Sequence, residues 1–139
     1  MRRSSLTIIA IAALFGSTSL VSLFAAEKDS SNSATQTGVA ACYSRRLNGH
    51  RTSSGQRYDP EALTASHATI PVGTHVKVTN VENGKSVVVL VNDHMSGHGH
   101  REVVMDVSQQ ACKELEFGRG GKAKVKLEVE PSNSDKTSH

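Results

Sequence analysis

The stretch that decides the fold is Ser86-Val87-Val88-Val89-Leu90-Val91-Asn92-Asp93. The run from Val87 to Val91 is continuously apolar, which predicts a strand that is buried on both faces and lies at the centre of a sheet. The dipeptide Asn83-Gly84 lies shortly before this run and is the strongest short signal for a tight hairpin turn. We therefore expect residues 86–91 to pair with the segment that precedes the turn.

Other short segments also carry strand patterns. Residues 75–79 alternate between polar residues and valine, and residues 103–107 have the composition of a strand. Residues 122–130 alternate between charged and apolar side chains, which predicts a final strand with its charged side outward. Residues 38–43 are apolar and can open the sheet, whereas residues 44–60 are rich in Gly, Ser, Arg and Asn and predict a long surface loop.

One short helix interrupts these strands. Ser108 is a residue type that caps the start of a helix and Gly118 is typical of its end, so we expect a helix between them. The strands do not alternate with helices, which argues against a layered α/β fold. The sequence therefore predicts an all-β domain, a small closed barrel of five or six strands with one short helix.

Asp93 follows the most apolar strand and begins a loop rich in Gly and His. We expect its carboxyl group at the rim of the barrel, partly shielded from water, which suits a general acid. The alternative is that Asn92-Asp93 only caps a turn, and spacing alone favours that interpretation.

The first residues have the layout of a signal peptide. Arg2 and Arg3 precede an apolar run and then small residues that end at Ala26. We expect residues 1–26 to be removed on export to the periplasm or cell envelope. No later stretch reaches the roughly 18 apolar residues that a spanning helix needs, so we expect no membrane anchor.

The rest of the chain divides into one domain and two tethers. Residues 27–37 and 131–139 are polar without apolar periodicity and are predicted to be a disordered linker and a disordered tail. Residues 38–130 have the length of one small domain, with room for one active site. We expect this domain to act as a monomer.

The formal net charge of +3 changes once the signal peptide is removed. The 16 basic residues lose the two leader arginines, and the remaining 14 stand against 13 acidic residues, a net charge of +1. A nucleic-acid interface needs basic residues gathered on one face, so the composition does not support nucleic acid as a partner.

The two cysteines, Cys42 and Cys112, both lie in the predicted domain. An oxidising compartment outside the cytoplasm allows them to pair, and we expect a disulfide. The alternative is two separate buried thiols that pack as small apolar side chains.

A series of short motifs resembles the rare lipoprotein A (RlpA) family. The series comprises Gly38-Val39-Ala40-Ala41-Cys42-Tyr43, Gly49, Thr52, Gly55, Tyr58-Asp59, Leu63-Thr64-Ala65-Ser66-His67, Pro71-Val72-Gly73-Thr74, Val76-Lys77-Val78-Thr79-Asn80, Asn83-Gly84, Val91-Asn92-Asp93 and Asp106-Val107-Ser108. The resemblance covers nearly all of residues 38–130 and implies a six-stranded double-psi β-barrel.

The resemblance also implies an activity. Members of that family are endolytic lytic transglycosylases that cleave the glycan strands of peptidoglycan, favour strands without stem peptides, and form 1,6-anhydro ends without a metal or cofactor. The family's catalytic pair falls on His67 and Asp93. Asp93 would protonate the bridging oxygen between N-acetylmuramic acid and N-acetylglucosamine, and His67 would orient it. The conjugate base of Asp93, or a water-linked neighbour, would then take the proton of the muramoyl 6-hydroxyl group. Without the motif, His67 reads as a structural hydrogen-bonding residue.

Further residues are expected at the glycan. Thr64 belongs to a matching motif, and His94 stands where the family usually has an arginine, so both are predicted to contact substrate. Tyr58 is either a platform that stacks on a sugar ring or a partly buried anchor of its loop. Asp59 is interpreted as a turn residue, and Asp106 as structural, although it could line the groove.

Two alternatives stay open. His94, His98 and His100 lie in one short loop beside Asp93, a set that could bind zinc, copper or nickel, but we expect solvated histidines and no metal. The residues after Asp93 depart from the family's usual Arg-Gly-Pro, which keeps a non-catalytic glycan-binding module, like those of expansin-like and barwin-like proteins, as the alternative function.

Overall fold

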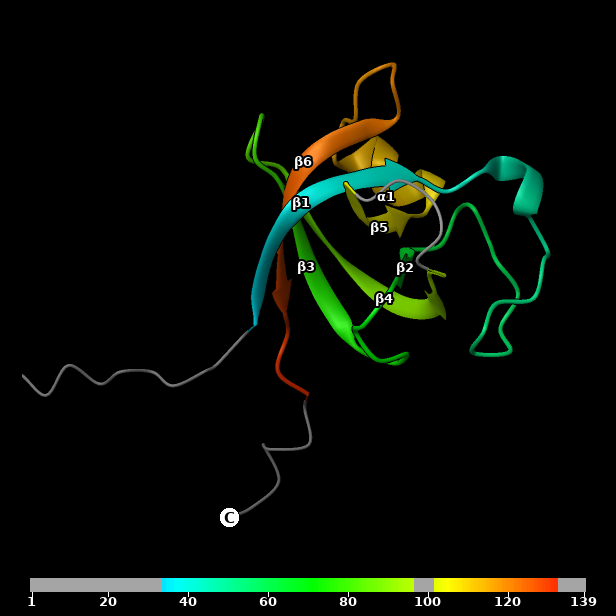
Figure 1. Cartoon of the computed structure of the whole chain (residues 1–139). Helices are drawn as coiled ribbons and strands as arrows, with labels where there is room; N and C mark the ends of the chain where they lie inside the picture. The colour runs from blue at the N-terminus through cyan, green and yellow to red at the C-terminus, as the bar shows by residue number, and fades with distance from the viewer. Residues whose placement is uncertain (1–33, 97–101, 133–139) are drawn as a thin grey trace, which may run out of the picture. The chain divides into compact units, whose positions relative to one another are not determined.

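The computed structural model describes residues 34–96 and 102–132. In these residues six strands close into a barrel in the order β1-β5-β2-β4-β3-β6, joined by a short 3-10 helix and one α-helix (Figure 1). The elements are β1 (Thr35–Cys42), η1 (Arg45–Leu47), β2 (Thr64–His67), β3 (His75–Asn80), β4 (Ser86–His94), β5 (Val103–Val107), α1 (Gln109–Glu114) and β6 (Lys122–Val129). The predicted six-stranded barrel with one short α-helix is confirmed.

Most strand predictions hold. β3 and β4 form the antiparallel hairpin expected from Asn83-Gly84, and Gly84 has the positive φ of 75° that this turn requires. β5 and β6 lie where their patterns placed them, and Ser108 caps α1 by accepting a hydrogen bond from the Ala111 N–H. The helix ends at Glu114 instead of near Gly118 because Glu116 turns into the left-handed region at φ 53°.

The expectation that β4 is buried on both faces is wrong. Val87, Val89 and Val91 point into the barrel, whereas Val88 is 43 % exposed on its outside. A closed barrel has one packed interior and one outer face, so residues along each strand alternate between them. The unbroken run of aliphatic residues from Val87 to Val91 therefore reflects the preference of β-branched side chains for strand backbone more than burial on both faces.

The predicted linker also ends too late. The sequence places residues 35–37 in the linker, but they pair with residues 126–128 of β6 as the first part of β1. Strand pairing uses backbone groups, and therefore the polar side chains of Thr35, Gln36 and Thr37 do not prevent it.

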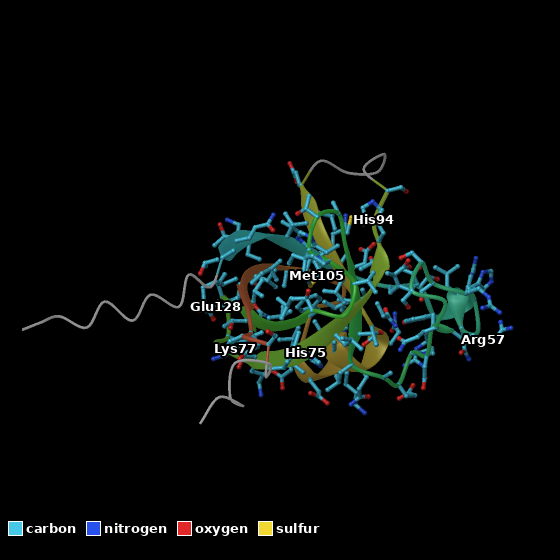
Figure 2. All side chains as sticks on the ribbon, turned by 90° about the horizontal axis from the view of Figure 1, so that it is seen from below. Arg57, His75, Lys77, His94, Met105 and Glu128 are labelled. Carbon is cyan, nitrogen blue, oxygen red and sulfur yellow. A yellow bond between two sulfur atoms is a disulfide. The ribbon has the colours of Figure 1, made fainter. Side chains whose placement is uncertain are left out.

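The barrel encloses a core of aliphatic side chains. Met105 lies at its centre, as Figure 2 shows, and is fully buried with Val76, Val89 and Leu127. Leu115, which follows α1, closes the core and is also fully buried. No helix in residues 34–96 and 102–132 is long and apolar enough to cross a membrane.

A disulfide joins Cys42, at the end of β1, to Cys112 in α1, the pairing expected from the sequence. The two residues are separated by 70 positions, and their Cα atoms lie 5.8 Å apart. Closing a loop of this length stabilises the native state by about 4 kcal/mol in the chain-entropy model. The bond also fixes the strand that leads directly into Tyr43.

We expect the double variant Cys42→Ala/Cys112→Ala to lose about 4 kcal/mol of unfolding free energy, because the unfolded chain regains the entropy of an open loop. Urea unfolding of the oxidised wild type, the reduced wild type and the variant measures the loss. An unchanged midpoint in both altered forms would contradict this account.

Candidate active site

A β-bulge turns Asp93 to the outside of the barrel. β2 and β4 pair Ala65 with Val91 and then Ser66 with Asp93, so Asn92 is one extra residue on β4. Without it, position 93 would continue the inward series of Val87, Val89 and Val91. The bulge therefore moves the carboxyl group from the core to the outer face, beside Ser66. Asp93 belongs to the strand itself and not, as expected, to the loop after it.

Three donors hold the Asp93 carboxylate. Its Oδ1 accepts hydrogen bonds from the backbone N–H groups of Ser53 and His94, each at 2.9 Å. Its Oδ2 accepts one from the Tyr43 hydroxyl at 3.2 Å. Hydrogen bonds to both oxygens stabilise the charged form of a carboxylate and fix its orientation.

The turn formed by residues 52–56 clamps the bulge. Ser54 N–H donates to the carbonyl of Asn92 at 3.3 Å, and the His94 N–H donates to Ser53 Oγ at 2.8 Å. Asn92 Nδ2 donates to Gln56 Oε1 at 3.2 Å. The turn belongs to the projecting loop between β1 and β2, in which Arg57 is labelled in Figure 2. Because the turn makes these hydrogen bonds, the loop positions the Asp93 carboxylate.

Two carboxylates share one cleft. Ser66 of β2 pairs with Asp93 on one side and with Asp106 of β5 on the other, so the three side chains lie in a row on one face. They line an open cleft of about 520 Å³ that also includes Tyr43 and His94. A small pocket beside it has Tyr43, Ser66, Asp93 and Asp106 in its wall as well.

Tyr43 supports this row. Burial, followed by the charge of Asp93 and the hydrogen bond to it, raises the pKa of Tyr43 to about 12. The phenol therefore stays protonated and remains a donor to Asp93. Its ring packs edge to face on Tyr58 with 4.6 Å between centroids. Tyr58 is only 4 % exposed, which fits the loop-anchor interpretation, and its predicted contact with a sugar stays a prediction.

His67 is buried, and both of its ring nitrogens have partners. Nδ1 accepts hydrogen bonds from the backbone N–H groups of Thr69 and Ile70, at 3.0 and 2.9 Å. In a neutral ring Nε2 then carries the proton and donates to Gln36 Oε1 at 3.0 Å. Burial, and then the charge of His94, lowers the pKa of His67 and favours this neutral form.

Within the part of the chain that the structure describes, His67 lines neither the cleft beside Asp93 nor the small pocket next to it. Its backbone carbonyl accepts the Met95 N–H at 3.1 Å, just beyond Asp93. His67 therefore contacts the segment that carries the acid, and a direct catalytic role stays a prediction.

The other predicted site residues divide between the two hollows. Thr64 lines the small pocket, and His94 lines the cleft with its side chain exposed. His98 and His100 lie outside the described residues. Among residues 34–96 and 102–132, no three His, Cys, Asp or Glu side chains are placed to hold a metal ion.

Asp106 is the residue whose place the sequence interpretation underrated. Its half-buried carboxyl group has no hydrogen bond or ion pair within the described part of the chain. Burial raises the pKa of Asp106, and the charge of Lys122 opposes the shift. Tyr43 and Ser66 were also missed. Asp106 lies between the apolar residues Met105 and Val107, and this alternation was the signal that its side chain faces outward.

Lowering the pH should destabilise the protein partly through His67. The unfolded ring takes up a proton near its ordinary pKa of 6.5, but the buried ring does so only at lower pH. Stability is therefore fully present above 6.5 and falls as the pH drops through the folded pKa. Urea unfolding between about pH 7.5 and about pH 5 should show a shallower loss for His67→Asn than for wild type. Equal slopes would contradict the buried neutral ring.

Asp106→Asn should stabilise the domain at neutral pH. The folded carboxyl has a raised pKa, so the folded state binds more protons than the unfolded state and stability falls as the pH rises above 3.8. Asparagine removes this cost, and the gain should vanish below pH 3.8. Thermal and urea unfolding measure it, with the exposed Asp59→Asn as control. A variant less stable at neutral pH would count against the desolvated carboxyl.

Known proteins have sequences similar to the part of this chain that forms the barrel. A family model described as lytic transglycolase matches residues 35–127. The endolytic peptidoglycan transglycosylase RlpA of Neisseria meningitidis serogroup A is 50 % identical over 94 residues, 68 % of this chain and 38 % of the relative. The RlpA proteins of Vibrio cholerae and Rickettsia felis are 42 % and 41 % identical over 68 % and 77 % of this chain, and over 35 % and 47 % of their own lengths. The chain spans less than half of each of these relatives.

Similarity to solved structures is limited to the fold. An expansin of Clavibacter michiganensis, solved as a mutant in complex with cellohexaose, has a TM-score of 0.57 at 18 % identity, over 72 % of this chain and 52 % of its own. The same expansin without ligand gives the same TM-score at 21 % identity. With a family model over nearly all of the barrel and relatives of 41–50 % identity, the chain belongs to the RlpA-type lytic transglycolase family of double-psi β-barrels.

Proposed function

We propose that this protein is an endolytic lytic transglycosylase of peptidoglycan. It cleaves the linkage between N-acetylmuramic acid and N-acetylglucosamine, prefers strands without stem peptides, and leaves 1,6-anhydro ends. The observation that carries the proposal is the Asp93 carboxylate, which three hydrogen-bond donors fix in an open cleft on the outer face of a family barrel. An open cleft suits an endolytic enzyme because a strand can enter it without a free end.

The reaction needs one proton donor and one proton acceptor. The bond between C1 of the muramoyl residue and the bridging oxygen breaks, and that oxygen takes a proton. The muramoyl 6-hydroxyl oxygen forms the new bond to C1 and loses its proton to a base. The site therefore has to place an acid and a base on different oxygens of the same linkage.

The family resemblance implies that Asp93 donates a proton and that its conjugate base accepts one, and the hydrogen bonds at Asp93 suit the accepting role. Its three donors stabilise the charged carboxylate, and the Tyr43 hydroxyl does not ionise in the working pH range. Asp93 takes the proton of the 6-hydroxyl group in this proposal. His67 is a positioning residue that holds the segment after Asp93 through its carbonyl contact with Met95.

The cellular setting is part of the same proposal. Residues 1–26 have the layout of a signal peptide and lie outside the described residues, so export to the periplasm or cell envelope rests on the sequence and on the cell-wall enzymes it resembles. The partner is the glycan strand itself, and the domain works as a monomer.

Asp93→Asn should lower the formation of 1,6-anhydro ends at least about 100-fold, because loss of a general base typically costs two to four orders of magnitude. The assay incubates the mature protein with peptide-free glycan strands and counts those ends by mass spectrometry. Strands that carry stem peptides should react more slowly.

Asp59→Asn is the matched control, since Asp59 caps its own turn by accepting the Glu61 N–H and lies outside the cleft lining. If the wild type binds the strands and leaves them intact, the protein is the non-catalytic binding module. If Asp93→Asn and Asp59→Asn react equally fast, Asp93 is not the base.

A further inference from the structure

The reaction proposed above still lacks its acid, and the cleft contains one unassigned carboxyl group. Asp106 and Asp93 lie on the same face of the sheet, two strands apart, with Ser66 between them. Adjacent strands are about 4.8 Å apart, so the backbones of the two aspartates are separated by roughly 10 Å. The small side chain of Ser66 leaves a hollow between them that both carboxyl groups border.

The surroundings of the two carboxyl groups differ. Asp93 has three hydrogen-bond donors, whereas Asp106 has none within residues 34–96 and 102–132. A half-buried carboxyl group without donors favours its neutral, protonated form. The carboxyl group without donors is the one suited to give up a proton, and the one held by three donors is suited to receive one.

We propose that Asp106 is the general acid of this site and protonates the bridging oxygen while the Asp93 carboxylate accepts the proton of the 6-hydroxyl group. This assignment rests on the proposed transglycosylase function. The C1–O4 bond breaks with its electron pair on the bridging oxygen, which takes the Asp106 proton. The C1–O6 bond forms, and its proton passes to Asp93. Solvent in the open cleft then returns Asp106 and Asp93 to their starting states.

Charged and titratable groups reach the cleft from several elements. Lys122 of β6 pairs with Ala41 of β1, which pairs with Asp106, and its charge favours the Asp106 anion. Asp93 and His94 face the cleft from β4, and Tyr43 from the segment after β1. β2 contributes the uncharged Ser66. Lys122 is therefore the cation whose removal should make Asp106 a weaker acid.

The pH dependence of the cleavage rate tests this assignment. Wild-type activity should fall as the pH rises, because Asp106 loses the proton it must donate. Lys122→Met should move this alkaline limb to higher pH, a change that a purely structural Asp106 would not cause. Asp106→Asn should lower the rate at least about 100-fold, and its residual activity should lack the limb.

Unfolding measurements show whether Asp106→Asn loses activity because it unfolds or because it lacks the acid. This variant is expected to be at least as stable as wild type at neutral pH. Asp59→Asn again serves as the matched control. Carbon-13 NMR of the Asp106 carboxyl group in the wild type gives a readout independent of turnover. Its titration midpoint should lie above the ordinary value of 3.8. A peptide-free glycan tetrasaccharide should shift the Asp106 signal and leave that of Asp59, which lies outside the cleft lining, unchanged.

The outcomes distinguish the two proposals. A wild type that forms 1,6-anhydro ends, together with an Asp106→Asn variant of equal rate or an unmoved limb in Lys122→Met, would overturn the role of Asp106 and leave the function intact. A wild type that forms no such ends would overturn the function and the acid with it.

Discussion

The site depends on one constraint of strand pairing, the position of β2 between β4 and β5. β2 runs parallel to β4 and antiparallel to β5, and the two registers meet at Ser66. The bulge at Asn92 brings Asp93 into this row. Without that extra residue the carboxylate would point into a core of valine and methionine, where a charge is costly. The long loop before β2 then secures the bulge through the turn at residues 52–56.

The same arrangement gives two similar side chains, Asp93 and Asp106, different surroundings. Backbone N–H groups and a tyrosine hydroxyl surround Asp93, whereas Asp106 is partly removed from water without such donors. Burial raises the pKa of Asp106, and a carboxyl group with a raised pKa inside a cleft suits acid–base chemistry. The disulfide from Cys42 to Cys112 fixes the end of β1 next to Tyr43.

Local sequence patterns predicted the strands that have one buried face and one face exposed to water. Alternation in β3 and β6, the Asn83-Gly84 turn and the Ser108 cap are signals confined to a few residues, and each was read correctly. β2 has the sequence Thr64-Ala65-Ser66-His67, which carries no apolar pattern from which a strand could be predicted. It forms a strand because it pairs with β4 on one edge and with β5 on the other. The bulge at Asn92 and the exposed outer face of β4 likewise depend on how β4 pairs with its neighbouring strands. A short stretch of sequence does not contain those strands, so it cannot predict either feature.

The candidate site divides in the same way. Asp93 could be predicted because it lies just after an apolar run in the sequence and matches a family motif. Its nearness to Asp106 arises from register across β2 and has no signature in the sequence between them. Likewise, the hydrogen bonds from Tyr43 and Ser53 join residues 50 and 40 positions away from Asp93.

If Asp93 and Asp106 act as base and acid, one linkage of the glycan must lie between them. A crystal structure of Asp93→Asn with a peptide-free tetrasaccharide of N-acetylglucosamine and N-acetylmuramic acid would show this linkage. We expect the muramoyl 6-hydroxyl oxygen within hydrogen-bond distance of the side chain at position 93 and the bridging oxygen within that distance of the Asp106 carboxyl. A saccharide bound across another face, such as the hollow between Gly73 and Glu130, would contradict it.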